Sequence, residues 1–242
     1  MGALAAPAPV QRARRIGMNY TFQFGVALAT LPQLLQGAIV TFELGLLTFW
    51  GGALIGLLGA SLKTFGGPWL RGLANAYVIF FTNTPALIQI YFLYFGLPEF
   101  GIRWDNFTCV LIGLTLNAGA YLTEIMRAGF ISVQRTEMEA AETIGMSLVQ
   151  QIRFVIVPHI AKTIYPALAN FFIVVLVMGT SVGAVVGVDE LTGTAINIST
   201  ENYRWIEMFI VVACIYVVLT FIASLSLALL GRWAFRVKAK VF

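Results

Sequence analysis

Long and nearly uninterrupted apolar stretches constrain the fold of this chain more than any other feature. They occupy approximately residues 33–62, 71–97, 108–130, 155–187 and 205–231. A helix needs about 20 mostly apolar residues to cross a bilayer, and only helices and closed barrels satisfy their backbone hydrogen bonds in lipid. Because these stretches are continuous rather than alternating, the chain is predicted to be an all-α integral membrane protein with about five transmembrane helices.

Composition agrees with a bilayer environment. Of the 242 residues, 59% are hydrophobic and 11% are charged, whereas about 25% charged residues are usual in soluble domains. The net charge of +4 does not indicate a nucleic-acid partner, because the cations mainly flank apolar stretches. Cys109 and Cys214 lie within apolar stretches and are expected to pack as small hydrophobes. No signal peptide is predicted, since no apolar run with a cleavage site directly follows the basic residues near the N-terminus.

The distribution of lysine and arginine predicts the orientation in the membrane. Only Arg103 and Arg204 fall in loops on one side, whereas most cations lie near residues 135–158 or in the C-terminal tail. Cytoplasmic loops are enriched in such residues, so residues 135–158 are expected in the cytoplasm. Five spans then place the N-terminal tail, residues 1–30, outside, although Arg12, Arg14 and Arg15 run against the rule. Residues 31–242 are expected to form the membrane domain.

The polar stretch 135–158, RTEMEAAETIGMSLVQQIRFVIVP, interrupts the apolar sequence. Thr136 and Glu139 have the spacing of a capping box, and Ser147 is suited to cap a second short helix after a bend at Gly145. Two interpretations are open: an amphipathic helix on the membrane surface, or a segment that a soluble partner grips. A single apolar face is predicted from Met138, Ala141, Ile144, Leu148 and Ile152.

The same stretch resembles the EAA loop of ABC importer permeases. The resemblance lies in Glu139-Ala140-Ala141, Gly145 and the ending Val155-Ile156-Val157-Pro158, which has valines where isoleucine and leucine are usual. Three further segments resemble the polar amino-acid branch of that family, of the histidine and glutamine permease type. They are NTPALIQIYFLYFGLP from Asn83, AYLTEIMRAGFISV from Ala120 and TSVGAVVGVDELT from Thr180. The resemblance covers nearly everything after residue 33.

This resemblance implies a MetI-like fold and a permease subunit of an ATP-driven amino-acid importer in the bacterial cytoplasmic (inner) membrane. The implied partners are two ABC ATPase subunits, a second permease chain (a copy or a different one) and an extracytoplasmic solute-binding protein. The loop, at about residues 135–158, would act as a cytoplasmic coupling helix. The implied coupling residues are Glu139, Ala140, Ala141, Gly145, Met146 and Ser147.

No enzymatic chemistry is expected in this chain. It lacks a GxxxxGK[ST] nucleotide-binding loop, so ATP and Mg²⁺ are expected on the partner ATPase. No cofactor or metal site is predicted, and the single histidine, His159, is interpreted as an interfacial side chain. An ion-coupled secondary transporter of small polar solutes is the alternative, but such proteins need carboxylates at the membrane midplane and often contain repeats. A membrane scaffold or sensor is a further alternative, although it would need no polar cluster inside the spans.

Polar residues within spans are costly and tend to face a cavity or another helix. A cluster around Pro85 is expected either to line a translocation path or to satisfy a loosened backbone. Thr82 stands where the family commonly has arginine. Family members often have acidic or basic residues at the positions that Phe171, Met178 and Gly179 occupy here. A less charged pocket is therefore expected. The predicted path residues are Asn83, Thr84, Pro85, Gln89, Asn117, Tyr121, Asn170, Thr180 and Ser181.

Smaller patterns predict packing. Gly52 and Gly56 have the spacing that permits close contact between helices, and so does the series Gly179, Gly183 and Gly187. Glu124 and Arg127 lie one helical turn apart and are expected to form an intrahelical ion pair.

Overall fold

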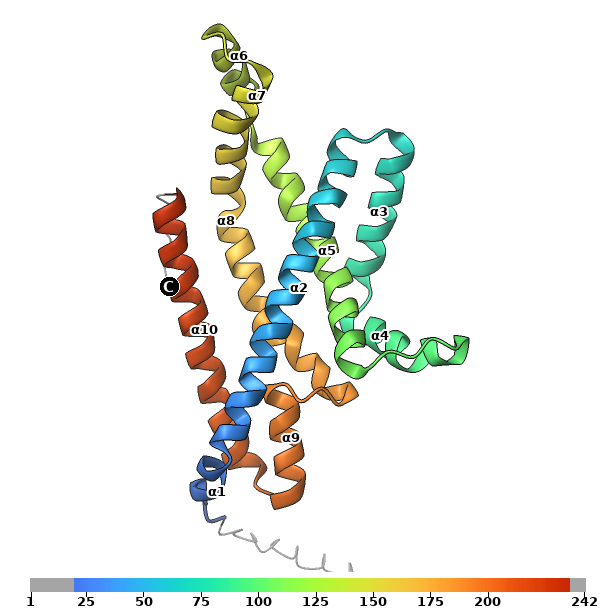
Figure 1. Cartoon of the computed structure of the whole chain (residues 1–242), viewed down its shortest axis with the longest axis vertical. Coiled ribbons are helices and arrows are strands. Elements are labelled where there is room, and N and C mark those ends of the chain that lie inside the picture. Colours follow the sequence, from blue (N-terminus) through green and yellow to red (C-terminus); the bar gives the residue numbers. More distant parts are fainter. Residues whose placement is uncertain (1–19, 236–242) are drawn as a thin grey trace, which may run out of the picture.

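The computed structural model describes residues 20–235, and every regular element in that range is helical (Figure 1). The prediction of an all-α protein is therefore confirmed. The α-helices are α1 (Phe24–Ala29), α2 (Leu31–Phe65), α3 (Pro68–Asn83), α4 (Ala86–Tyr91), α5 (Asn106–Ser132), α6 (Arg135–Thr143), α7 (Leu148–Gln151), α8 (Val157–Val174), α9 (Leu191–Asn202) and α10 (Trp205–Phe235). Short π or 3₁₀ segments adjoin them: η1 (Phe92–Gly96), η2 (Leu97–Phe100), η3 (Ile152–Ile156), η4 (Val175–Gly179) and η5 (Thr180–Val186).

Four helical segments of the described chain are long and apolar enough to cross a membrane, and a bent pair gives a fifth. The four segments are Leu31–Phe65, Asn106–Ser132, Leu148–Val186 and Trp205–Ala234. The count of about five transmembrane helices is thus confirmed.

The second apolar stretch is not one straight span. Helix α3 and the segment Ala86–Phe100 meet at an angle of 100°, so the span predicted for residues 71–97 is present as a bent pair, with the bend at the proline expected to loosen the backbone. Proline disfavours helical backbone in the residue before it, and Thr84 accordingly is extended at φ −111° and ψ 129°. Figure 1 shows α4 turning away from the direction of α3 at this point.

Helices α2 and α5 form the most extensive contact in the bundle. Glycines on α2 make it possible: a Cβ built at Gly52 would lie 2.9 Å from Ala118 Cβ, and one at Gly56 would lie 2.7 Å from Leu122 Cβ. The close packing predicted for Gly52 and Gly56 is confirmed.

The small-residue ridge predicted from Gly179, Gly183 and Gly187 is wrong. These glycines lie in the π segment η4, in the 3₁₀ segment η5 and at its C-cap, so they do not share one α-helical face. Gly187 ends the segment at φ +79°, a left-handed conformation that glycine adopts without steric cost.

Two polar anchors hold the end of the bundle that carries α1 and α9 (Figure 1). The buried carboxylate of Glu207 accepts hydrogen bonds from the Tyr20 hydroxyl and from the backbone N–H of Gln23 at 2.9 Å, which fixes the described part of the N-terminal tail to α10. Glu190 caps α9 by accepting from the N–H groups of Thr192 (2.9 Å) and Gly193 (2.8 Å). The basic residues Arg12, Arg14 and Arg15 lie outside the described residues.

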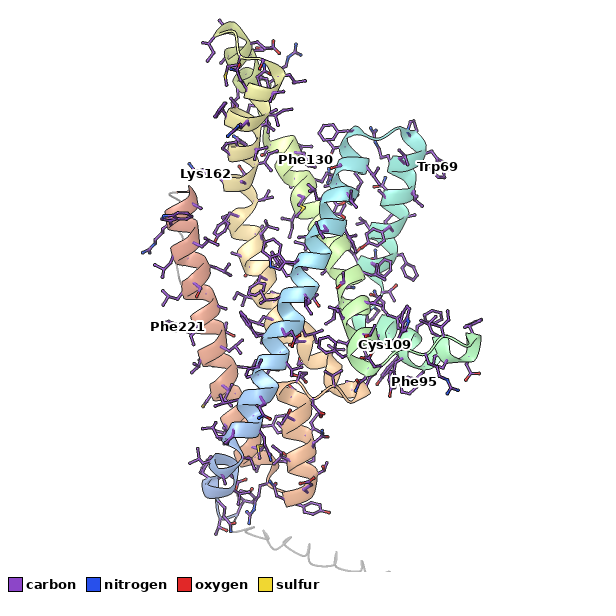
Figure 2. All side chains as sticks on the ribbon, viewed as in Figure 1. Trp69, Phe95, Cys109, Phe130, Lys162 and Phe221 are labelled. Carbon is purple, nitrogen blue, oxygen red and sulfur yellow. The ribbon has the colours of Figure 1, made fainter. Side chains whose placement is uncertain are left out.

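Large apolar side chains also cover the outside of the bundle. Figure 2 shows Trp69, Phe95 and Phe221 pointing away from the neighbouring helices, and they are 77%, 60% and 50% exposed. Apolar surface on this scale requires lipid or another protein chain as its surroundings.

Candidate functional site

The helix break between α3 and α4 is stabilised by side chains that replace missing backbone donors. Pro85 has no N–H to offer the carbonyl of Phe81, one turn earlier. That carbonyl instead accepts from Asn117 Nδ2 at 2.9 Å and from Gln89 Nε2 at 3.2 Å. Gln89 Nε2 also donates to the carbonyl of Thr84 at 2.9 Å. The predicted role of polar side chains in satisfying a loosened backbone is therefore seen directly.

The last turn of α3 is closed in the same way. Thr82 Oγ1, Asn83 Nδ2 and Thr84 Oγ1 each donate to the carbonyl four residues earlier, at 2.7, 2.8 and 2.8 Å. Asn83 Nδ2 also donates to Thr82 Oγ1 at 3.4 Å. These bonds use the hydrogens of the side chains but leave the oxygens of Asn83 and Thr84 able to accept. The same residues line a cavity, so the two interpretations of this cluster are compatible.

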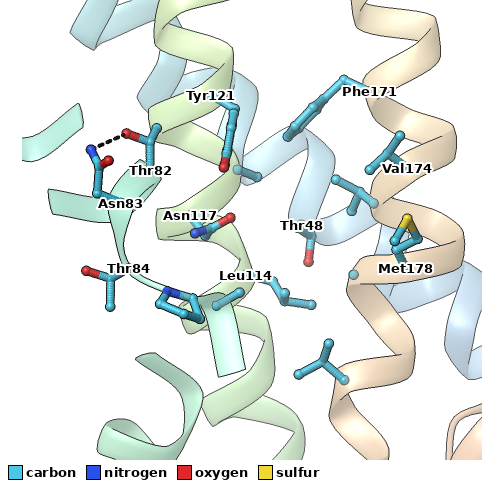
Figure 3. A pocket seen from close by; sticks show the side chains of 16 residues that line it. Thr48, Thr82, Asn83, Thr84, Leu114, Asn117, Tyr121, Phe171, Val174 and Met178 are labelled. Atoms are coloured by element: carbon cyan, nitrogen blue, oxygen red, sulfur yellow. Dashed lines mark hydrogen bonds between the residues drawn. The ribbon is translucent and has the colours of Figure 1, made fainter. Parts of the chain in front are cut away.

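This cavity has a volume of about 660 Å³ and lies between α2, the α3–α4 break, α5 and the rod formed by α8 and η4 (Figure 3). One wall is polar but uncharged, and the wall supplied by α8 and η4 is apolar. No charged side chain is among the lining residues. The polar members are Thr48, Thr82, Asn83, Thr84, Asn117 and Tyr121, and the larger apolar members are Leu114, Phe171, Val174, Val175, Met178 and Val182.

The structure brings five of the nine predicted path residues into this cavity. They are Asn83, Thr84, Pro85, Asn117 and Tyr121. Their role in transport stays a prediction. Thr48 and the apolar wall could not be singled out from the sequence, because threonine and valine are common within spans.

The other four predicted path residues do not line this cavity. Gln89 is buried behind the break, at 8% exposure, where its amide serves the backbone. Asn170 lies on an exposed face of α8. Thr180 and Ser181 donate to the carbonyls of Leu176 (2.8 Å) and Met178 (3.1 Å), and neither is among the residues that form the cavity. Local helical register therefore turns these side chains away.

A second candidate site is the segment α6–α7, which projects beyond the other helices at one end of the bundle (Figure 1). The predicted cap at Ser147 is confirmed: its Oγ accepts from Gln150 N at 3.4 Å while Gln150 Oε1 accepts from Ser147 N at 2.8 Å. The predicted capping box of Thr136 and Glu139 is wrong. Helix α6 already begins at Arg135 with Gln134 as N-cap, and the Glu139 carboxylate accepts from Arg135 Nε at 2.9 Å instead.

The turn between α6 and α7 depends on Gly145, which adopts φ +77°. The bend predicted there is confirmed. Met146 is half-buried, and its backbone N–H donates to the carbonyl of Ala141 at 3.1 Å. Ala141 is buried at 4% exposure within its own chain, whereas Glu139 and Ala140 are exposed.

The single apolar face predicted for this segment is wrong, because the turn separates two short helices. Four apolar side chains between residues 144 and 154, from the turn through α7 into η3, are exposed instead, and we call them the α6–α7 patch. Its members and their exposed fractions are Ile144 (76%), Leu148 (66%), Val149 (72%) and Phe154 (63%).

Polar contacts join α6 to α8, and α2 to α5. Glu137 Oε1 of α6 lies 3.2 Å from His159 Nδ1 of α8. The pair predicted between Glu124 and Arg127 is confirmed at 2.8 Å, and Lys63 of α2 also contacts Glu124. Within residues 20–235, no group of three or more His, Cys, Asp or Glu side chains is placed to hold a metal ion.

Comparisons with known proteins agree with this architecture. Residues 52–236 match the family described as binding-protein-dependent transport system inner membrane component. The probable amino-acid ABC transporter permease protein PatM of Vibrio harveyi is 35% identical over 81% of this chain and 88% of its own length. The glutamine transport system permease protein GlnP of Escherichia coli K12 is 33% identical over 87% of this chain and 97% of its own length.

Solved structures show the same fold. A crystal structure of an amino acid ABC transporter with histidines matches at a TM-score of 0.80 and 35% identity, covering 88% of this chain and 99% of that one. A chain of the MetNI methionine ABC transporter in an inward-facing conformation matches at a TM-score of 0.70 and 19% identity, over 85% of this chain and 98% of that one, and shows likeness of fold. The MetI-like fold is confirmed, and the chain is a multi-pass protein of the inner membrane. On these matches, it belongs to the family of binding-protein-dependent transport system inner membrane components.

Proposed function

We propose that this chain is the permease subunit of an ATP-driven amino-acid importer and that the cavity at the α3–α4 break is its part of the translocation path. The observation that carries the proposal is the placement of this cavity. Uncharged polar groups line it at the sharp bend in the spanning segment formed by α3 and Ala86–Phe100. Non-helical backbone at membrane depth is tolerated where it lines a cavity or is buried in protein.

The segment α6–α7 is the proposed contact to a separate ATPase. It projects from the bundle, it carries the residues that resemble the EAA loop, and the α6–α7 patch leaves apolar surface uncovered. In this proposal two ATPase subunits, a second permease chain and an extracytoplasmic solute-binding protein complete the importer. ATP closes the ATPase subunits, they draw the α6–α7 segments of the two permeases together, and the spans tilt to open the path outward. The binding protein then releases its amino acid, and hydrolysis resets the assembly.

The ion-coupled secondary transporter fits the cavity less well. Such a mechanism needs an ionisable group in the path to bind the coupling ion, and no carboxylate is among the residues that line the cavity.

The affinity-purified chain and its co-purifying subunits are reconstituted into vesicles loaded with ATP, with the end of the bundle that carries α6–α7 facing the vesicle interior. The test measures uptake of a mixture of radiolabelled amino acids by these vesicles. We expect an ATPase to co-purify and uptake to require ATP. Uptake that continues after removal of the ATPase and follows a proton gradient would favour the secondary transporter and refute the proposal.

A further inference from the structure

A groove on the outside of the bundle is lined almost entirely by apolar side chains. It lies between α2 and α10, has a volume of about 440 Å³ and is also lined by the buried Phe172 of α8. Trp50 on the α2 side and Ile222 on the α10 side are both exposed. The one hydroxyl among the lining residues, on Ser226, already donates to the carbonyl of Ile222 at 2.8 Å. The groove therefore suits an apolar occupant.

Two cations flank the contact between α8 and α10 beyond one end of this groove. Arg232 follows Leu227, the last groove residue on α10, by about 8 Å along the helix axis. A Cβ built at the neighbouring Gly231 would lie 2.5 Å from Cε1 of Tyr165 on α8, and Lys162 is one helical turn before Tyr165. Figure 2 shows Lys162 on α8 beside the end of α10. The two helices thus bring both cations to the same end of the groove.

These cations have no anionic partner within residues 20–235. There, Lys162 and Arg232 take part in no hydrogen bond, ion pair or ring contact. Helix α8 carries no carboxylate, and the one acidic residue on α10, Glu207, is at the opposite end of that helix. Glu137 of α6 also reaches α8, but it pairs with His159. The described chain therefore leaves the positive charge of Lys162 and Arg232 uncompensated.

The cations and the groove together extend about as far as one membrane leaflet. At 1.5 Å per residue, Arg232 lies about 20 Å along α10 from Leu219, which lines the groove. The hydrocarbon of one leaflet is about 15 Å thick, half of the bilayer core. Lysine and arginine side chains near helix ends extend to the headgroup level, and tryptophan, here the exposed Trp233, is enriched at that level.

A helix of a second permease chain is the alternative occupant. It would cover the apolar residues, but it would also have to place acidic side chains beside Lys162 and Arg232. A phospholipid supplies the apolar chain and the anionic phosphate in one molecule, and basic pockets between spanning helices on the cytoplasmic side hold anionic headgroups. Charge complementarity therefore favours the lipid.

We propose that the groove between α2 and α10 holds an acyl chain of an anionic phospholipid, whose phosphate group binds Lys162 and Arg232. The inference goes beyond the proposed function and uses it only to assign these cations to the cytoplasmic leaflet.

The experiment measures contact between lipid and Trp50, which lines the groove. The chain with its co-purifying subunits is reconstituted into phosphatidylcholine bilayers, and phosphatidylglycerol with brominated acyl chains replaces a rising fraction of the lipid. Brominated phosphatidylcholine is the comparison. Bromine quenches tryptophan fluorescence on contact, and the difference between the parent protein and Trp50→Phe isolates the signal of Trp50.

Phosphatidylglycerol should quench Trp50 at a lower fraction of the lipid than phosphatidylcholine does. One basic residue near the membrane surface changes the affinity for anionic lipid by roughly 5-fold. With two such residues, half-maximal quenching by phosphatidylglycerol should need a lipid fraction on the order of 10-fold lower.

Substitutions then test the cations. Combining Lys162→Gln with Arg232→Gln should abolish the preference, so that both brominated lipids quench Trp50 at the same fraction. Arg71→Gln is the matched control, because Arg71 lies on α3, across the bundle from α10 in Figure 1, and contacts only the Gly66 carbonyl, at 3.4 Å. This variant should keep the full preference for phosphatidylglycerol.

A second pair of variants tests the groove. Ser226→Phe adds a ring within the groove and should reduce quenching of Trp50 by brominated phosphatidylglycerol. Leu229→Phe is its control, because Leu229 is exposed on α10 but does not line the groove. Both positions are exposed, so the subunits should still co-purify with either variant.

Four results would overturn the inference. They are equal quenching of Trp50 by the two lipids in the parent protein, a preference that survives loss of both cations, quenching that Ser226→Phe leaves unchanged, and quenching by neither lipid. The last result would show that another protein chain covers the groove.

Discussion

The contact between α2 and α5 allows a quantitative prediction at Gly56. A Cβ built there would lie 2.7 Å from Leu122 Cβ, 2.9 Å from the backbone carbonyl carbon of Leu122 and 3.1 Å from the backbone nitrogen of Thr123. Favourable carbon–carbon contacts lie at about 3.5–4.0 Å. Two of the three opposing atoms are backbone atoms of α5 and cannot rotate aside, so Gly56→Ala must push the helices apart.

The energetic cost can be isolated with a second glycine. Overpacking a close contact costs about 1–3 kcal/mol, while replacing glycine by alanine within a helix gains about 1 kcal/mol. Gly72 in α3 is exposed, and a Cβ there would have no atom within 4 Å. Gly72→Ala should therefore show the helix gain alone. The difference between the two variants should equal the steric cost, about 1–3 kcal/mol in favour of Gly72→Ala.

The assay is thermal unfolding in nanodiscs, followed by a thiol-reactive fluorescent dye. Cys109 is fully buried and reacts only after unfolding, whereas Cys214 is exposed and is first replaced by serine. At roughly 2–4 °C per kcal/mol for a chain of this size, Gly56→Ala should melt about 2–12 °C below Gly72→Ala. A Gly56→Ala variant that melts at or above the control would show that α2 and α5 do not pack as tightly as described.

Three further outcomes follow from the two ends of the bundle. Gly145→Ala keeps the segment in place but adds roughly 1–2 kcal/mol of left-handed strain, so ATP-driven uptake should fall while the subunits still co-purify; normal uptake would contradict the role of the turn. Burial raises the pKa of Glu190, so the folded protein binds the proton of this carboxyl more tightly than the unfolded chain does. The melting temperature should therefore rise as the pH falls through the pKa of Glu190 in the folded protein. Glu190→Gln should lose this pH dependence, and a variant that keeps it would show that Glu190 is not its source. Glu137→Ala removes the pair with His159, so amide exchange in α6 should increase relative to Glu137→Gln, which keeps a hydrogen-bonding oxygen; equal exchange would show that the pair does not hold α6 to α8.

Much of the fold could be predicted because spans, caps and turns each depend on a short stretch of sequence. The apolar stretches identified the spans, Ser147 identified a cap, and Gly145 identified a turn. The predicted capping box was wrong because the spacing of two residues does not determine where the helix begins. Thr136 and Glu139 have the right spacing, but α6 already begins at Arg135, which offers Glu139 a charged partner. Helix boundaries that differ by two residues cannot be distinguished from a spacing alone.

The cavity was only partly predictable because register decides which side of a helix faces it. Pro85 signalled a break, and the nearby Asn83 and Thr84 do line the cavity. Thr180 and Ser181 were equally plausible as polar residues in a span, but π and 3₁₀ segments change the number of residues per turn around them. A helical pattern extrapolated through such segments assigns side chains to the wrong face.

The cavity lies between two bodies of different construction, and this arrangement bears on how it could change shape. Thr48 and Asn117 belong to α2 and α5, which the glycine contacts lock together. The apolar wall belongs to Leu148–Val186, a helical rod of 39 residues that starts at the capped N-terminus of α7 and passes through α8 into η4. A force on α7 therefore has a helical path without a break in the chain to the apolar wall, although Pro158 and Pro166 each remove a backbone donor from it. The polar wall belongs to α2 and α5, and α5 is joined to α6 by Val133 and Gln134 and packs against α8. If α6–α7 is the proposed contact to the ATPase, we expect its movement to widen or narrow the space between the two walls.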